Sequence, residues 1–192
     1  MSLYVIVLLA AMITLTLYGI VIYNSLVNVK HNVAKSWANI EVLLKQRHDE
    51  LPKLVEVCKQ YRDFEQATLH RVMEARSKVL GASQSHDVTA LGKAETALRG
   101  SLANLFAVAE AYPELRSNQQ FLNLQERIIA LESAIADRRE FYNESVNINN
   151  VRIEQFPDLI VARMFEFHPK VLLEFRASER ADANLKALFA AH

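Results

Sequence analysis

The first 29 residues contain no formally charged side chain, because all 22 basic and all 22 acidic residues lie at or after Lys30. Within this stretch, residues 3–23 read LYVIVLLAAMITLTLYGIVIY. An α-helix of about 21 residues spans roughly 30 Å, the thickness of the hydrocarbon core of a bilayer. Tyr18 and Tyr23 lie near its end, where an aromatic ring with a hydroxyl suits the lipid–water boundary. The sequence therefore predicts a transmembrane anchor at residues 1–23, in contact with the lipid bilayer through residues 3–23.

A cleaved signal peptide is the alternative interpretation of this segment. Signal peptides usually carry a basic start, a shorter apolar stretch and a cleavage site of small residues. Here no Lys or Arg precedes the apolar run, and the run ends in Gly-Ile-Val-Ile-Tyr-Asn. A buried core helix is disfavoured as well, because no polar second face is present. These features favour an uncleaved anchor.

The charges on either side of the anchor predict its orientation. Lys30 and Lys35 follow the apolar run closely, whereas no positive side chain precedes it. The positive-inside rule places the basic side in the cytoplasm. We therefore expect a single-pass protein of the inner (cytoplasmic) membrane, with its body in the cytoplasm.

The composition of the chain favours long helices and excludes some classes of function. Only 4 Gly and 4 Pro interrupt 192 residues, too few for many short strands and tight turns. The formal net charge is zero, which argues against nucleic acid as a partner. A single cysteine, Cys58, excludes a disulfide framework within the chain.

Apolar residues recur at spacings of three and four along four segments, the period of an amphipathic helix. The first stripe contains Leu26, Val29, Val33, Trp37, Ile40 and Leu44. The second contains Leu51, Leu54 or Val55, Cys58, Tyr61, Leu69, Val72 and Val79, with a polar interruption near Glu65. The third contains Leu91, Leu98, Leu102, Leu105, Ala109 and Tyr112. The fourth contains Phe121, Leu124, Ile128, Leu131, Ile135, Arg138, Tyr142, Val146, Asn149 and Phe156.

Helix-breaking and capping residues separate these stripes. Asp49 with Pro52 predicts the start of a second helix, since proline is tolerated in a first turn; a kink in one continuous helix is the alternative. Residues 81–83 separate the second and third helices, and Pro113 ends the third. Residues 117–120 predict a capping box with the Ser117 oxygen as the cap. Pro157 ends the fourth helix.

We therefore predict an all-α fold, a single N-terminal transmembrane helix followed by an antiparallel four-helix bundle. The first bundle helix either continues directly from the anchor or breaks at residues 23–25. The expected domains are the anchor at residues 1–23, the bundle at residues 24–157 and a C-terminal tail at residues 158–192, with a short helix near residues 181–191.

No motif for catalysis or metal binding is found in the sequence. A di-iron bundle requires Glu-x-x-His pairs, and no Glu has a His three residues later. The six histidines are scattered singly, without His-x-x-x-His spacing. Cys58 lies on an apolar stripe and is interpreted as a small buried hydrophobe. Gly92 and Gly100, eight residues apart, are expected to allow close helix contact. We predict a non-enzyme without metal or cofactor.

Polar residues crowd the last turns of the fourth helix. They are Arg138, Asn143, Asn147, Asn149 and Asn150. One interpretation is a polar pocket or a surface for docking a partner. The other is a buried hydrogen-bonded network or a solvated face, and buried polar groups must be paired to be tolerated.

Several of these segments, taken together, resemble the LemA family. They are Tyr23 to Val27, Ala34 to Trp37, Leu44 to Asp49 with Leu51-Pro52 and Leu54-Val55, Glu110 to Leu115, Asn118 to Gln125, Arg138 to Asn143, and Phe156-Pro157. The resemblance implies a bacterial membrane protein with one N-terminal anchor and an antiparallel helical bundle, and it supplies no catalytic residues. Lys53 and Glu166 depart from the family pattern, and the tail after Phe167 matches poorly.

The function predicted from these features is a membrane-anchored scaffold or adaptor that binds a protein partner, such as a membrane protein, or associates with itself. Sensing of a small molecule or peptide by the polar end of the fourth helix is the second hypothesis, and a metal-binding bundle enzyme is the third. The candidate structural or docking residues are Trp37, Arg47, Tyr112, Pro113, Arg138, Tyr142, Asn143 and Asn147.

Overall fold

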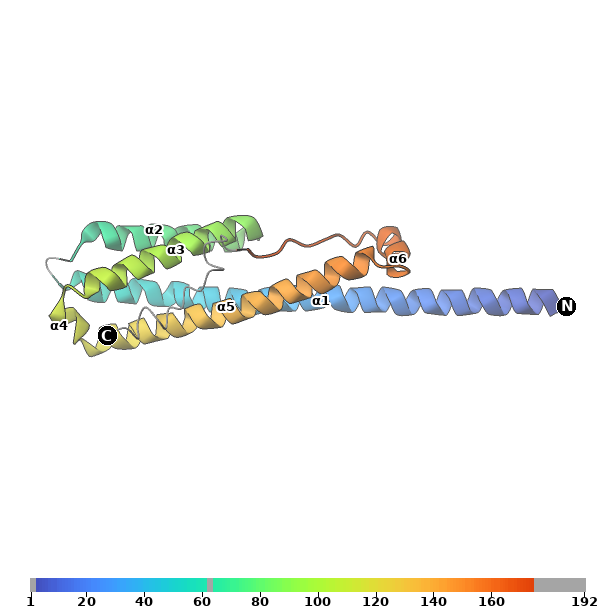
Figure 1. Ribbon diagram of the computed structural model, residues 1–192, viewed down its shortest axis with the longest axis horizontal. Coiled ribbons are helices and arrows are strands. Elements are labelled where there is room, and N and C mark those ends of the chain that lie inside the picture. Colours follow the sequence, from blue (N-terminus) through green and yellow to red (C-terminus); the bar gives the residue numbers. More distant parts are fainter. Residues whose placement is uncertain (1–2, 62–63, 175–192) are drawn as a thin grey trace. The chain divides into compact units, whose positions relative to one another are not determined.

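The computed structural model describes residues 3–61 and 64–174 (Figure 1). These residues form α-helices and no strand, which confirms the all-α prediction. The helices divide the chain differently from the four predicted bundle helices. They are α1 (Leu3–Lys59), α2 (Gln66–Gln84), α3 (Val88–Ala109), α4 (Pro113–Arg116), α5 (Gln119–Glu154) and α6 (Asp158–Met164). The short helix expected near residues 181–191 lies outside the described residues.

The apolar run forms the first part of α1. One 18-residue window in this helix has a mean hydropathy of 2.7 and is only 6% buried, so α1 is long and apolar enough to cross a membrane. Thr14 and Thr16 donate their hydroxyl hydrogens to the carbonyls of Ala10 and Met12, at 2.9 and 2.8 Å. Their polar groups are therefore satisfied within the helix. No break occurs at residues 23–25.

The helix also continues through Pro52, so the prediction of a new helix opening at Asp49 is wrong. Proline has no N–H, and the carbonyl four residues earlier, that of His48, loses its helical donor. Arg76 of α2 supplies a replacement, because its Nε–H donates to the His48 oxygen at 2.9 Å. A guanidinium from the neighbouring helix thereby satisfies the carbonyl that the proline leaves free.

The second predicted stripe belongs to two helices. Its first half lies on the end of α1, which stops at Lys59, and its second half lies on α2, which begins at Gln66. The polar interruption near Glu65 marks the start of α2. The Thr68 hydroxyl donates to the Glu65 carboxylate at 2.6 Å.

The other helix ends follow local capping chemistry. The side chain of Asp87 accepts from the Ala90 N–H at 2.9 Å and caps α3. Pro113, predicted to end the third helix, is instead the first residue of α4, because α3 already ends at Ala109. The cap of α5 is Asn118 and not Ser117, since the Asn118 oxygen accepts from the N–H groups of Gln120 and Phe121. The Ser117 hydroxyl instead donates to the Glu114 carbonyl.

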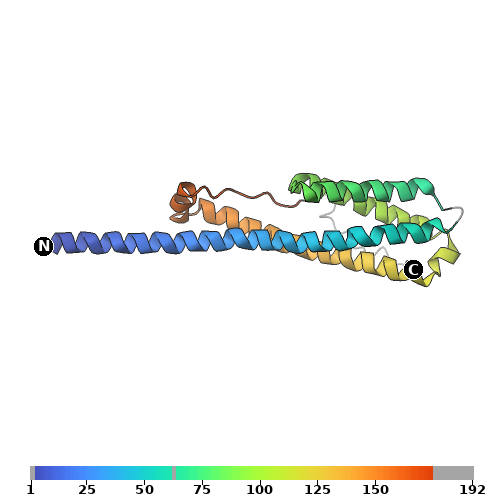
Figure 2. The same ribbon diagram turned by 180° about the vertical axis from the view of Figure 1, so that it is seen from behind.

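The described residues form two compact units, and α1 and α5 contribute to both. The first unit contains residues 3–39 and 140–172, and the second contains residues 40–61, 64–139 and 173–174. In the second unit, α2 and α3 run side by side in opposite directions (Figure 2). Its core is built from the predicted stripes, including Leu51, Leu54, Leu91, Leu98, Leu105, Ile128 and Ile135.

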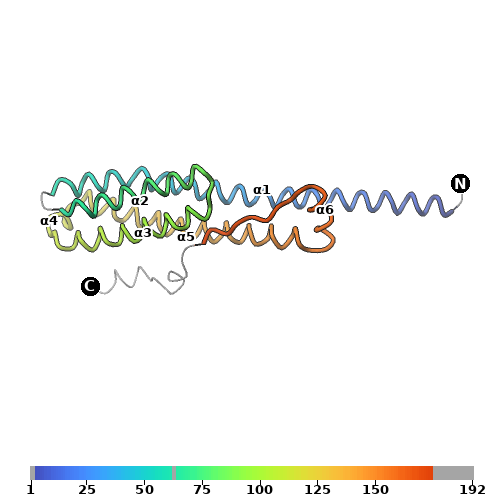
Figure 3. Tube along the Cα trace, turned by 90° about the horizontal axis from the view of Figure 1, so that it is seen from above, coloured from blue at the N-terminus to red at the C-terminus, as the bar shows by residue number. Residues whose placement is uncertain are grey.

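In the first unit, α6 packs against the end of the apolar run (Figure 3). The buried residues of this cluster are Ile22, Leu26, Ile153, Val161 and Ala162, with Phe167 partly buried against them. The Tyr23 ring centroid lies 4.7 Å from that of Phe165 and 6.0 Å from that of Phe167. Apolar periodicity does not predict α6, because seven residues are too few to establish a period.

Candidate functional site

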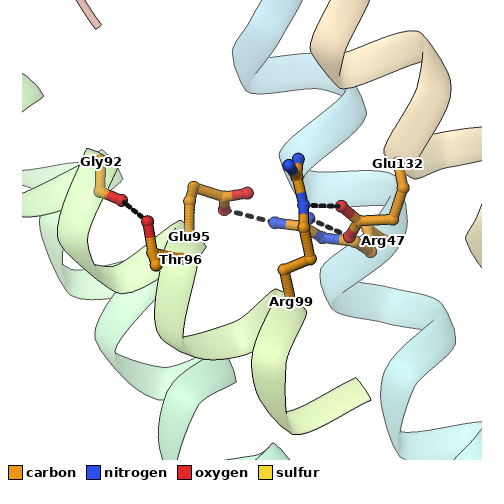
Figure 4. Close-up of polar contacts among 6 residues, drawn as sticks. All are labelled: Arg47, Gly92, Glu95, Thr96, Arg99 and Glu132. Carbon is orange, nitrogen blue, oxygen red and sulfur yellow. Dashed lines mark hydrogen bonds and ion pairs between the residues drawn. The ribbon is translucent and has the colours of Figure 1, made fainter. Parts of the chain in front are cut away.

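Three helices of the second unit place four charged side chains in one network (Figure 4). Arg47 of α1 binds Glu95 of α3 through one guanidinium nitrogen and Glu132 of α5 through the other. Arg99 of α3 donates its Nε–H to the second oxygen of Glu132 at 3.2 Å. Arg47 and Glu95 are each only 1% exposed. The network therefore connects α1, α3 and α5 inside the unit.

Because the network is buried, each charged group in it needs an oppositely charged partner to remain ionised. Two cations face two carboxylates, and buried ions are tolerated when they are paired and hydrogen-bonded. Burial lowers the pKa of Arg47, but the attraction of Glu95 and Glu132 outweighs it and the net pKa is raised. Burial raises the pKa of Glu95 despite the opposing attraction of Arg47. The second oxygen of Glu95 is buried without a hydrogen-bond partner, so Glu95 is the least well satisfied member.

A polar groove lies between α1 and α5 in the same unit. Its volume is about 910 Å³, and seven of its ten lining residues carry amide or charged side chains. Near it, one oxygen of Glu50 accepts from Arg127 at 2.6 Å and from Lys53 at 3.2 Å. The lining residues are Pro52, Lys53, Glu56, Val57, Gln60, Gln119, Gln120, Asn123, Leu124 and Arg127. Such a surface offers donors and acceptors to a partner, and Pro52, Val57 and Leu124 add apolar surface to it.

The side chains of His48 and Arg76 form a polar contact between α1 and α2, separate from the ion network. Besides its bond to the His48 carbonyl, the Arg76 guanidinium lies 2.6 Å from Nε2 of the His48 ring. A guanidinium can only donate, so this ring nitrogen accepts and the ring is neutral. Burial, and then the Arg76 charge, lower the pKa of His48, with Asp49 opposing them. The contact therefore favours the uncharged imidazole.

In the first unit, the polar end of α5 binds an extended segment of the chain's own backbone, residues 168–171. Asn150 donates to the Lys170 carbonyl at 2.9 Å and accepts from the Lys170 N–H at 2.8 Å. Asn149 donates to the His168 carbonyl at 3.4 Å, and Tyr142 donates to the Val171 carbonyl at 3.0 Å. Burial raises the pKa of the Tyr142 hydroxyl, which remains a donor. These side chains act as a clamp for main-chain atoms.

In the second unit, the continuation of this segment approaches α3 at Gly92. Leu173 is 1% exposed, and a Cβ atom at position 92 would lie 2.2 Å from the Glu174 oxygen. A Cβ at Gly100 would meet nothing within 4 Å. The expectation that both glycines allow close helix contact is therefore wrong. Gly92 admits an extended backbone, and Gly100 faces open space.

The structure does not bring the eight predicted candidate residues together. Trp37 packs on Tyr142 in the first unit, with ring centroids 5.4 Å apart, and Asn143, the residue after Tyr142, is half-buried. In the second unit, Arg47 is in the ion network, and Tyr112 packs on Phe64 with ring centroids 5.2 Å apart. Asn147, Arg138 and Pro113 are exposed. The placement of Arg138 on the buried stripe is therefore wrong.

Glu95 and Glu132 are not among the residues predicted from the sequence, although their spacing indicates buried positions. Glu95 falls four residues after Leu91 and three before Leu98, and so occupies a stripe position. Glu132 stands in the same relation to Ile128 and Ile135. A charged residue at the spacing of a buried stripe predicts a buried ion. Two carboxylates on the stripes, with Arg47 between Leu44 and Leu51, would have indicated the network.

Within the described part of the chain, Cys58 and the histidines add no further site. Cys58 is buried, and burial raises the pKa of its thiol to about 12, so it carries little thiolate at neutral pH. Across residues 3–61 and 64–174, no group of three or more His, Cys, Asp or Glu side chains is placed to hold a metal ion.

Comparison with known proteins gives related sequences of two kinds. The LemA family model matches residues 36–187. Protein LemA of Metamycoplasma hominis is 23% identical over 167 residues, covering 86% of this chain and 74% of that protein. Magnetosome proteins MamQ 2 of Paramagnetospirillum magneticum and MamQ of Magnetospirillum gryphiswaldense are each 22% identical over 158 residues, covering 70% of this chain. The matched part spans 58% of the length of each magnetosome protein.

Proposed function

Because this chain belongs to the LemA family, as the sequence resemblance indicated, we propose that it is a membrane-anchored, non-enzymatic scaffold or adaptor. Residues 3–23 hold it in the inner (cytoplasmic) membrane by a single pass, with the helical body on the cytoplasmic side. The body, an antiparallel bundle in which α1, α2, α3 and α5 supply the long helices, binds a protein partner or a second copy of the chain.

The observation that carries the proposal is a contrast along α1. The large apolar side chains between Leu3 and Val21 are 44–85% exposed, whereas Ile40, Leu44, Leu51 and Leu54 are at most 4% exposed. Apolar surface of this extent is unfavourable in water and favourable in lipid. One helix therefore combines a segment suited to the bilayer with a segment that builds a packed body.

The polar groove between α1 and α5 is the docking surface that we propose for the partner. The buried charges of Arg47, Glu95 and Glu132 are occupied with one another and hold helices together. The groove, in contrast, presents exposed amides such as Gln120 and Asn123. The cation of Arg127 is also exposed and is paired with Glu50. Its volume of about 910 Å³ accommodates several side chains of a partner.

Site-specific photo-crosslinking in intact cells tests this surface. A photoreactive residue replaces Gln120 in the groove, and a matched variant carries it at Gln84, an exposed glutamine at the end of α2. We expect an adduct of defined mass from position 120 and none from position 84. An adduct of twice the chain's mass identifies self-association. Equal adducts from both positions, or none from position 120, would contradict docking in the groove.

The anchor is tested separately by extraction and mass measurement. Membranes are washed with alkaline carbonate, and the intact mass of the retained protein is determined. We expect the chain to stay in the membrane pellet with residues 3–23 present. Release into the supernatant, or a mature chain trimmed near residue 25, would contradict the anchor and favour the signal-peptide alternative.

Peptide sensing is a second candidate, favoured by the clamp on α5. Asn150 recognises main-chain atoms of Lys170 and no side chain, so another extended peptide could take the place of residues 168–171. A labelled synthetic peptide of residues 166–174 serves as the probe. Saturable binding to the full chain that Asn150→Ala abolishes would support this function, and absence of binding would oppose it.

A further inference from the structure

The first unit exposes a group of large apolar side chains on and beside α6. Phe156 is 80% exposed, Met164 66%, Ile160 56% and Phe165 54%. We call these four residues the α6 patch. Exposed apolar patches on a folded protein mark surfaces that contact a partner or a membrane.

The short helix is apolar on more than one side. Val161 and Ala162 are buried against α1 and α5, while Ile160 and Met164, one turn apart, are exposed. A helix whose apolar residues extend beyond its packed side needs a second apolar environment. Among the residues described in the first unit, packing provides only one apolar environment for this helix.

The position of the α6 patch identifies that environment. The buried side of α6 packs on Ile22 and Leu26, at the end of the apolar run, and Phe165 stacks at an angle on Tyr23, the last residue of the run. Ile22 and Leu26 are separated by one helical turn, about 6 Å along the axis. If residues 3–23 cross the bilayer, α6 is held at the depth where the hydrocarbon gives way to headgroups.

The residues around the patch suit this depth. Tyrosine is enriched at membrane–water boundaries, which suits Tyr23. Helices that lie in the boundary carry Phe and Leu on the side that enters the lipid, and Phe156 and Phe165 supply such apolar rings. Arg163 is exposed on α6, where its cation can bind lipid phosphate. The acidic residue of α6, Asp158, is buried and paired with Arg152. Exposed Glu154 and Glu166 flank the patch and require contact with water, which limits its insertion to the boundary.

We propose that the α6 patch is a second lipid-binding surface, which lies in the boundary layer of the bilayer beside the point where α1 leaves it. The inference rests on the proposed membrane anchor and adds to it a lateral contact. With two contacts, the first unit has a fixed tilt and rotation on the membrane, which one helix alone does not provide.

Spin labelling of the full chain in liposomes tests the proposal. Single cysteines for labelling replace Ile160 and Met164 in the patch, Leu15 in the apolar run and Lys35, an exposed residue about 18 Å beyond Tyr23 along α1. The parent chain, in which Cys58 is buried, controls for background labelling. Each label is scored by the ratio of its accessibility to oxygen, which partitions into lipid, and to a water-soluble nickel chelate.

We expect the ratio to be highest at Leu15, intermediate at Ile160 and Met164, and several-fold lower at Lys35. A ratio at Ile160 and Met164 equal to that at Lys35, with Leu15 still high, would overturn the lipid contact and leave the anchor intact. Labels at 160 and 164 that are shielded from both reagents would show that protein covers the patch, and would also overturn it. A low ratio at Leu15 would refute the anchor itself.

Discussion

The two units use buried polar side chains differently. In the second unit, Arg47, Glu95 and Glu132 are ions that bind one another, and each comes from a different helix. In the first unit, the neutral side chains of Asn149, Asn150 and Tyr142 bind backbone atoms of residues 168–171. An ion network requires a matching side chain on every helix, so it specifies which helices pack together. A clamp of amides requires only an extended main chain.

Removal of the central cation is expected to have the largest effect. Arg47→Ala leaves Glu95 and Glu132 buried without their shared partner, and should lower the free energy of unfolding by about 3–5 kcal/mol. The matched control is Arg71→Ala, because Arg71 is exposed and lies 3.9 Å from exposed Glu65; its cost should be at most about 1 kcal/mol. Denaturant unfolding in detergent measures both, and similar losses for the two variants would argue against an ion network that stabilises the second unit.

Alanine substitutions at the two glycines of α3 test whether the second unit holds residues 173–174, which follow the clamped segment. Gly92→Ala should expel Glu174 and with it Leu173, and lower the free energy of unfolding by about 1–2 kcal/mol after the gain in helix propensity. Gly100→Ala meets no atom and should raise it by about 0.5–1 kcal/mol. In thermal unfolding, we expect Gly92→Ala to lower the melting temperature and Gly100→Ala to raise it. Stabilisation by both substitutions would show that Leu173 is not held there.

The clamp in the first unit is tested by two asparagines of α5. Asn150→Ala removes two hydrogen bonds to Lys170 and should cost about 1–2 kcal/mol. Asn147→Ala, at an exposed position, should change stability by less than about 0.5 kcal/mol. Hydrogen exchange of the Lys170 amide gives a direct measurement, because its N–H donates to Asn150. Unchanged exchange in Asn150→Ala would contradict the clamp.

The smallest expected effect is a dependence of folding stability on pH, which arises from His48. Its pKa is lower in the folded chain than the ordinary value near 6.5, so the unfolded chain binds the proton more readily. Neutral His48 therefore contributes to the free energy of unfolding above about pH 6.5, and this contribution is lost as the pH falls through the pKa of His48 in the folded chain. Melting temperatures of the parent and of His48→Gln should converge on acidification. Parallel curves from pH 7.5 to pH 5 would refute this role.

Sequence periodicity predicted the helical class and most of the buried stripes, since residues such as Ile40, Leu98 and Ile128 recur at helical spacing and are buried. The chain breaks were harder to predict. Pro52 predicts either a helix start or a kink in one continuous helix. The residues near it do not decide between the two, because the donor that replaces its missing N–H lies 24 residues later, on Arg76. The clamp could not be predicted either, since Asn150 binds backbone atoms and main-chain geometry leaves no pattern in the sequence.

The bond from Arg76 to the His48 carbonyl has a consequence for how the chain tolerates change in length. Because Pro52 frees one particular carbonyl, the bond from Arg76 to that oxygen ties α2 to one position along α1, in addition to the buried apolar residues of α2. Residues inserted into the connection between Lys59 and Gln66 should therefore leave the alignment of the two helices unchanged. Moving the proline by one position along α1 would present a different carbonyl, rotated by about 100° around the helix axis, and misalign the pair.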